Sequence, residues 1–108
     1  MKTYYYYCSA TMGTMSIQET EMQKKAMSNF LKSFSIKPRI SKVKCGDTKY
    51  DYYYAAEIPF ESCNYLKVMR FIESLRAFCS FWRISLIEHS LNEIDSDKEC
   101  CNLTQFEY

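Results

Sequence analysis

The side chains best suited to chemistry are few in this sequence, and their spacing matches no catalytic motif. His89 is the only histidine, and Glu88 and Ser90 flank it. Adjacent residues of a strand point to opposite faces, so this triplet is poorly placed for acid–base catalysis. We therefore expect His89 to be an exposed or hydrogen-bonded histidine, with a cysteine–histidine nucleophilic pair as a minor alternative.

The spacing of the cysteines and the N-terminal sequence predict free thiols rather than a metal site or disulfides. No two of them form a C-x-x-C pair, and two adjacent cysteines chelate zinc poorly. The first residues lack the apolar run of a signal peptide, which predicts a reducing, cytoplasmic compartment. The six cysteines are Cys8, Cys45, Cys63, Cys79, Cys100 and Cys101. Two glycines are also too few for a phosphate-binding loop. From the cysteines and the glycines together, we expect free thiols, no metal, no cofactor and no enzymatic activity.

Ten of the 108 residues are tyrosine, and most of them fall in two short runs with strand propensity. Because strand side chains alternate between faces, each run must place rings on both faces of a sheet. Rings on an uncovered face suit contact with a protein partner or stacking on nucleic acid bases. The predicted contact residues are Tyr4, Tyr5, Tyr6, Tyr7, Tyr50, Tyr52, Tyr53 and Tyr54. The residues predicted to stack on bases are Tyr4, Tyr6, Tyr50, Tyr52 and Tyr54.

Charge is distributed unevenly along the chain, although the formal net charge is only +1. A basic segment in the middle contains Lys37, Arg39, Lys42, Lys44 and Lys49. These residues are candidates for contact with nucleic acid phosphates or with an acidic partner. The alternative is structural, since lysines on an edge strand prevent two sheets from pairing.

Hydrophobic periodicity and turn signals predict four strands and two helices. The S-x-x-E pattern at Ser16–Glu19 is typical of a helix start, and Pro38 prevents that helix from continuing. Gly46 and Asp47 predict the turn of a hairpin. The expected strands cover residues 2–12, 39–45, 49–58 and a segment that begins at Trp82, and the second helix is expected over residues 61–80. A stripe of apolar residues on the first helix is formed by Met22, Ala26, Met27, Phe30, Leu31 and Phe34.

This order of elements is that of the ferredoxin-like βαββαβ fold, an α+β domain with both helices on one face of an antiparallel sheet. Two right-handed crossovers place the first and third strands in the centre, where we expect the two tyrosine runs to meet. Residues 1–90 are expected to form this domain. Residues 91–108 are expected to form an acidic tail, either solvated, docked or added as a strand. The expected helix–sheet core contains Phe30, Leu31, Met69, Ile72 and Leu75.

Aromatic residues on two central strands resemble the arrangement in RNA-recognition-motif domains, whose rings stack on unpaired bases. The glycine-containing signature of that family's third strand is absent, because residues 49–55 contain no glycine. The resemblance implies a surface that binds single-stranded RNA or DNA.

The leading hypothesis from the sequence is a small, non-enzymatic binding protein. A short chain rich in tyrosine and lysine suggests a viral or mobile-element regulator or inhibitor of a host protein or nucleoprotein, for example a defence-system inhibitor such as an anti-CRISPR protein. The first alternative is a single-stranded nucleic-acid-binding domain that uses the tyrosines with the basic hairpin. The second alternative is a nucleotide-sequestering protein or small enzyme. A homodimer fits either binding hypothesis, and no membrane partner is expected.

Overall fold

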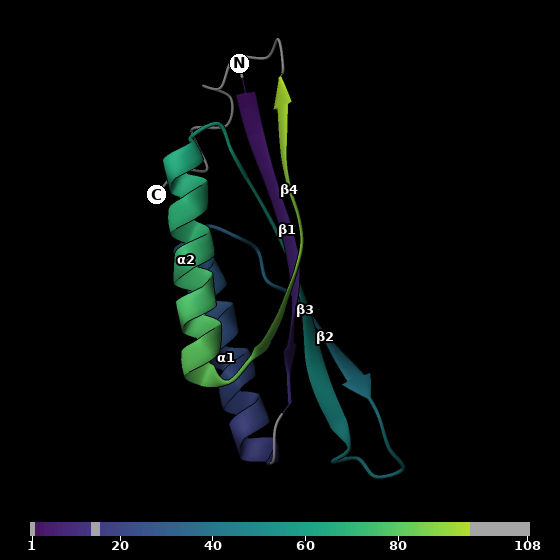
Figure 1. Ribbon diagram of the computed structural model, residues 1–108. Coiled ribbons are helices and arrows are strands. Elements are labelled where there is room, and N and C mark those ends of the chain that lie inside the picture. The colour runs from purple at the N-terminus through teal and green to yellow at the C-terminus, as the bar shows by residue number, and fades with distance from the viewer. Residues whose placement is uncertain (1, 14–15, 96–108) are drawn as a thin grey trace.

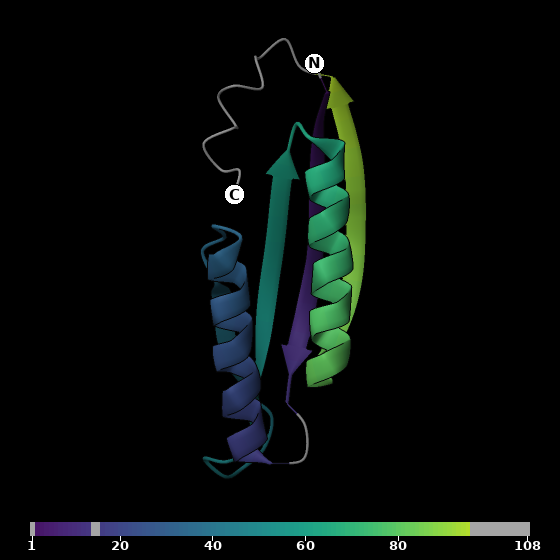
Figure 2. The same cartoon turned by 90° about the vertical axis from the view of Figure 1, so that its left-hand side faces the viewer.

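A four-stranded antiparallel sheet carries two helices on one of its faces (Figure 1). The computed structural model describes residues 2–13 and 16–95. The elements are β1 (Lys2–Met12), α1 (Ile17–Ser33), β2 (Arg39–Lys44), β3 (Tyr52–Ser62), α2 (Tyr65–Trp82) and β4 (Ser85–Asp95). In the view of Figure 2, α2 lies over β1 and β4, whereas α1 lies on the side of β3. The α+β class and the order of the elements are as the sequence predicts.

The strand order β2-β3-β1-β4 confirms that the first and third strands form the centre of the sheet. The expectation that the two tyrosine runs meet is wrong. The register pairs Tyr4 with Ser62 and Met12 with Tyr54, so the two runs lie at opposite ends of the β1–β3 ladder. The reason is that β1 and β3 are antiparallel, which brings the start of one strand beside the end of the other.

Helix α1 begins where the sequence pattern predicts. The Ser16 hydroxyl accepts a hydrogen bond from the backbone N–H of Glu19 at 3.1 Å, which satisfies one of the unpaired donors of the first turn. The helix ends at Ser33, before Pro38, and Ser35 has a left-handed φ of 59°. Met22 lies on the exposed surface rather than in the apolar stripe, since 57% of its surface is accessible.

The β2–β3 connection is longer than the three residues, 46–48, that the predicted strands leave between them. It spans residues 45–51 and is closed by a hydrogen bond from the Cys45 N–H to the Asp51 carbonyl at 2.9 Å. Gly46 packs tightly against Asp51, because a Cβ on Gly46 would lie 2.5 Å from the Asp51 Cβ. A larger residue at this position would force the loop to shift.

Helix α2 begins at Tyr65, later than predicted, because β3 continues through Pro59 to Ser62. A proline inside a strand is tolerated where the neighbouring strand does not need its N–H. Pro59 meets this condition, since β2 pairs with β3 only as far as Glu57. The Asn64 side chain then caps the helix by accepting hydrogen bonds from the N–H groups of Leu66 and Lys67.

Replacing Asn64 with alanine is expected to lower the free energy of unfolding by about 1 kcal/mol, because two helix N–H groups lose their acceptor. Urea unfolding followed by circular dichroism measures this change. Asn29→Ala is the matched control, since Asn29 is exposed within α1. Equal losses in the two variants would contradict a capping role for Asn64.

The core lies between the helices and the alternate residues of β1 and β3 that face them. Leu31, Ile72 and Leu75 are buried there as predicted, whereas Phe30 and Met69 are only partly buried at its margin. Gln23 is a buried polar member of this layer, and its Nε2 donates a hydrogen bond to the Trp82 carbonyl at 2.8 Å. This contact joins α1 to the C-terminal end of α2.

Candidate functional site: an open sheet face and a basic edge

The face of the sheet away from the helices is uncovered in the part of the chain that the structure describes (Figure 1). The alternation of tyrosines between faces follows the prediction. Tyr5 and Tyr7 of β1 and Tyr53 of β3 lie on the open face, and Tyr5 and Tyr7 are partly exposed. Tyr53 lies at the far end of β3, so it is separated from the other two rings.

Four of the predicted contact tyrosines lie on the helix-covered side instead: Tyr4, Tyr6, Tyr52 and Tyr54. Tyr6 and Tyr54 are buried, and Tyr4 packs against Tyr65 with ring centroids 5.1 Å apart. A side chain that fills the core cannot stack on a base, so base stacking by these rings on the sheet face is not supported. Tyr50 lies in the β2–β3 loop, with 58% of its surface accessible.

His89 lies at a β-bulge of β4. Tyr7 pairs with Ser90 and Cys8 with Glu88, so His89 is the extra residue between them. Its ring stacks on Tyr7 at 5.1 Å, and its Nε2 lies 2.8 Å from the Ser9 hydroxyl. His89 is therefore a hydrogen-bonded residue of the open face, as the sequence suggests.

Glu88 points to the opposite side of β4 from His89. Arg76 of α2 donates two parallel hydrogen bonds to the Glu88 carboxylate, from Nε at 2.5 Å and from the terminal nitrogen at 2.7 Å. This bidentate pair lowers the pKa of Glu88 below its usual value. Glu88 and His89 are thus held by different neighbours and do not act on one another.

The β1–β4 half of the open face carries exposed aliphatic side chains that the sequence analysis missed. Ile87 lies opposite Ser9 and is 54% exposed, and Ile94 lies opposite Thr3 and is 51% exposed. The strand extends to Asp95, five residues into the segment that we assigned to the tail; residues 96–108 lie outside the described residues. The bulge at His89 breaks the period of two, which hides the continuation of the strand beyond residue 90.

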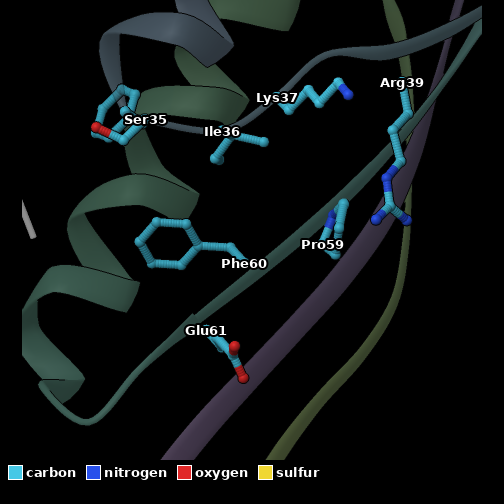
Figure 3. A pocket seen from close by; sticks show the side chains of 8 residues that line it. Ser35, Ile36, Lys37, Arg39, Pro59, Phe60 and Glu61 are labelled. Carbon is cyan, nitrogen blue, oxygen red and sulfur yellow. The ribbon is translucent and has the colours of Figure 1, made fainter. Parts of the chain in front are cut away.

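The predicted basic segment divides into two separate groups. Lys37 and Arg39 line a hollow of about 300 Å³ between the α1–β2 connection and β3, together with Pro59, Phe60 and Glu61. Figure 3 shows Phe60 at the centre of this hollow and Arg39 extended beside Pro59. Here β3 has no β2 partner, so its edge is open over the last residues of the strand.

Lys42, Lys44 and Lys49 form the second group, at the other end of β2. With Tyr52 they line a hollow of about 300 Å³. The Lys42 ammonium lies 4.0 Å from the centroid of the Tyr52 ring, within the range of a cation–π contact. The structure therefore brings these three predicted residues together and separates them from Lys37 and Arg39.

Glu21 of α1 holds the tyrosine rings beside this second group. The hydroxyls of Tyr52 and Tyr54 donate hydrogen bonds to its Oε2 at 2.5 and 2.6 Å. These hydrogen bonds keep the pKa of Glu21 below its usual value, and they raise the pKa of Tyr54 to about 12. Helix α1 thereby fixes the orientation of the Tyr52 and Tyr54 rings beside these lysines.

The two buried thiols, Cys8 and Cys79, are not activated nucleophiles. Cys8 and Cys79 are buried, and desolvation raises the pKa of Cys8 to about 11 and that of Cys79 to about 12. Cys45 is an exposed free thiol and Cys63 is partly buried, whereas Cys100 and Cys101 lie outside the described residues. Within residues 2–13 and 16–95, no three histidine, cysteine or acidic side chains are grouped to hold a metal ion.

Neither of the described helices is long and apolar enough to span a membrane. Comparison of the chain with family models, with curated proteins and with solved structures gave no match.

Proposed function

We propose that this chain is a ferredoxin-like, non-enzymatic binding protein, a small regulator or inhibitor that grips a protein partner along β4. Its interface, which we call the β1–β4 surface, is formed by Tyr5, Tyr7, Ile87 and Ile94 and by the free edge of β4. The single observation that carries this proposal is the exposure of Ile87 and Ile94 beside partly exposed aromatic rings. Exposed apolar patches on a domain surface commonly mark sites of protein contact.

The contrast between the two edges of the sheet supports the same surface. The β2 edge is only six residues long and carries Arg39, Lys42 and Lys44, features that discourage pairing with another strand. The β4 edge is eleven residues long and contains no lysine, arginine or proline. Its protective features are the bulge at His89 and the carboxylates of Glu88, Glu93 and Asp95. Two of these carboxylates are paired within the protein, Glu88 with Arg76 and Glu93 with Lys2. Of the two edges, β4 is therefore the one built to accept a partner.

The chemistry of this surface defines the partner that fits it. Backbone groups at the β4 edge suit an extended segment that adds to the sheet as a fifth strand. Ile87 and Ile94 on the open face suit apolar side chains at alternate positions of that segment. We therefore propose a protein partner that presents an extended, partly apolar segment, which would itself be blocked when the complex forms.

Replacing Ile87 with glutamate is expected to abolish partner capture, because it places a charge within the proposed contact. Folding should be nearly unchanged, since the side chain is about half exposed. Tagged wild-type and variant chains are expressed in host cells, and the proteins that they retain after nuclease treatment are quantified by mass spectrometry.

Leu66→Glu is the matched control, because Leu66 is an exposed aliphatic residue of α2, 65% accessible. The proposal requires a protein that is retained by wild type and Leu66→Glu but lost from Ile87→Glu. Retention of the same proteins by all three chains would contradict it. Self-association of the purified proteins is measured by sedimentation. If wild type self-associates and Ile87→Glu does not, the partner at this surface is a second copy of the chain.

A further inference from the structure

The hollow formed by β2, the β2–β3 loop and the start of β3 supports an inference that does not depend on the protein interface on β4. Lys42, Lys44 and Lys49 line it. Within the part of the chain that the structure describes, none of these three ammonium groups has a carboxylate within ion-pair distance. Three cations that form no ion pair around one hollow attract a multivalent anion.

The surroundings of the hollow preserve this positive charge. Residues 16–51 contain eight lysines or arginines and four acidic residues. The Glu21 carboxylate already accepts two tyrosine hydroxyls, and Asp51 accepts the backbone N–H and the hydroxyl of Thr48 at 3.2 and 3.0 Å. Neither carboxylate forms an ion pair with Lys42, Lys44 or Lys49, although the charge of Glu21 attracts Lys42, so the three ammonium groups remain available to an external anion.

An exposed aromatic ring adjoins these cations. The Lys49 ammonium lies 5.1 Å from the centroid of the Tyr50 ring, and 58% of the Tyr50 surface is accessible. Tyr52 forms the wall of the hollow under Lys42. Lysines beside exposed aromatic rings are the combination with which proteins bind single-stranded nucleic acid, since the cations contact phosphates and the rings stack on bases.

We propose that this lysine–tyrosine hollow binds the backbone of single-stranded nucleic acid, with Lys42, Lys44 and Lys49 at the phosphates and Tyr50 stacked on an unpaired base. A single strand fits better than a duplex, because the Tyr50 ring requires a base that is free of its neighbours. An acidic peptide would satisfy the lysines but would leave this ring unused. With the lysines at the phosphates and Tyr50 stacked on a base face, these contacts carry no sequence information, so we expect binding to depend little on sequence.

The test measures fluorescence anisotropy of a labelled oligothymidylate about 12 nucleotides long over a range of salt concentrations. Wild type should bind at low salt. In Lys42→Ala/Lys44→Ala, affinity should fall roughly tenfold, and the slope of log affinity against log salt should decrease by about 1.4, because two phosphate contacts of a single strand are lost. Tyr50→Ala should weaken binding roughly tenfold without changing that slope.

Lys67→Ala/Arg70→Ala is the charge-matched control on α2, and its affinity and salt slope should equal those of wild type. Tyr50→Phe should also bind as wild type does, since stacking does not need the hydroxyl. Absence of wild-type binding at low salt would overturn the proposal. So would equal losses of affinity in Lys42→Ala/Lys44→Ala and Lys67→Ala/Arg70→Ala. Displacement of the oligonucleotide by polyglutamate of equal charge as efficiently as by unlabelled oligonucleotide would also overturn it.

Discussion

Replacing Phe71 with alanine is expected to lower the free energy of unfolding by about 3 to 5 kcal/mol, the usual loss for a buried aromatic residue. Phe71 is fully buried at the centre of the aromatic cluster between α2 and the sheet. Its ring stacks on Phe60 with centroids 4.3 Å apart and meets Phe34 edge to face at 5.1 Å. Removing it leaves a cavity that neighbours from three elements cannot readily fill.

The matched control for this substitution lies on the same helix. Phe81 is 80% exposed, so Phe81→Ala should change the stability by no more than about 0.5 kcal/mol. Chemical unfolding followed by circular dichroism measures both variants. If the two phenylalanines proved equally costly to remove, the assignment of the buried face of α2 would be wrong.

Stability is expected to fall steeply in alkali. Burial raises the pKa of Cys8 to about 11, whereas the same thiol in an unfolded chain ionises near pH 9. Below pH 9 the thiol is protonated in both states, and its contribution to stability is fully present. Between pH 9 and 11 only the unfolded chain loses the proton, so folding loses about 3 kcal/mol from this thiol alone. Cys79, Tyr6 and Tyr54 also have raised pKa values and act in the same direction.

Urea unfolding at a series of pH values from neutral to about 11, in the presence of a reductant, measures this effect. Cys8→Ala removes the titrating group, so its stability should depend less steeply on pH than that of wild type. Cys45→Ala, which removes an exposed thiol, should follow the wild-type curve. A stability that stays constant up to pH 11, or the same dependence in Cys8→Ala, would contradict the prediction.

The order of the elements and the strand order could be predicted because local signals agree with one another. Ser16 caps α1, the apolar positions of both helices recur at helical spacing, and the handedness of crossovers then leaves one arrangement. The end of β3 was predicted wrongly: the expected strand stops at residue 58, before Pro59, whereas β3 continues through Pro59 to Ser62. A strand with one missing neighbour tolerates proline, and that missing neighbour is a property of the sheet rather than of the local sequence.

The candidate contact surfaces could be predicted only in part. Alternation in a strand correctly separates Tyr4 and Tyr6 from Tyr5 and Tyr7, but it does not show which pair faces the helices. Ile94 was missed because the bulge at His89 shifts the alternation and acidic residues surround Ile94. Ile87 was missed because it alternates with Leu86, and alternation does not show which of the two faces the helices. Lys42, Lys44 and Lys49 were recognised as basic, but their convergence on Tyr52 depends on the course of the β2–β3 loop.

The central position of β1 also determines when the sheet can form during synthesis. Both neighbours of β1 come later in the chain, and even the nearest pairing, Met12 with Tyr54, joins distant residues. At ordinary translation rates the ribosome needs roughly 2 to 10 s to add the intervening residues. Helix α1 can form within this interval from local contacts, but β1 has no partner. The nascent chain therefore carries its Tyr4–Tyr7 run unpaired until β3 emerges, and it is in this interval that assistance by a chaperone would matter most.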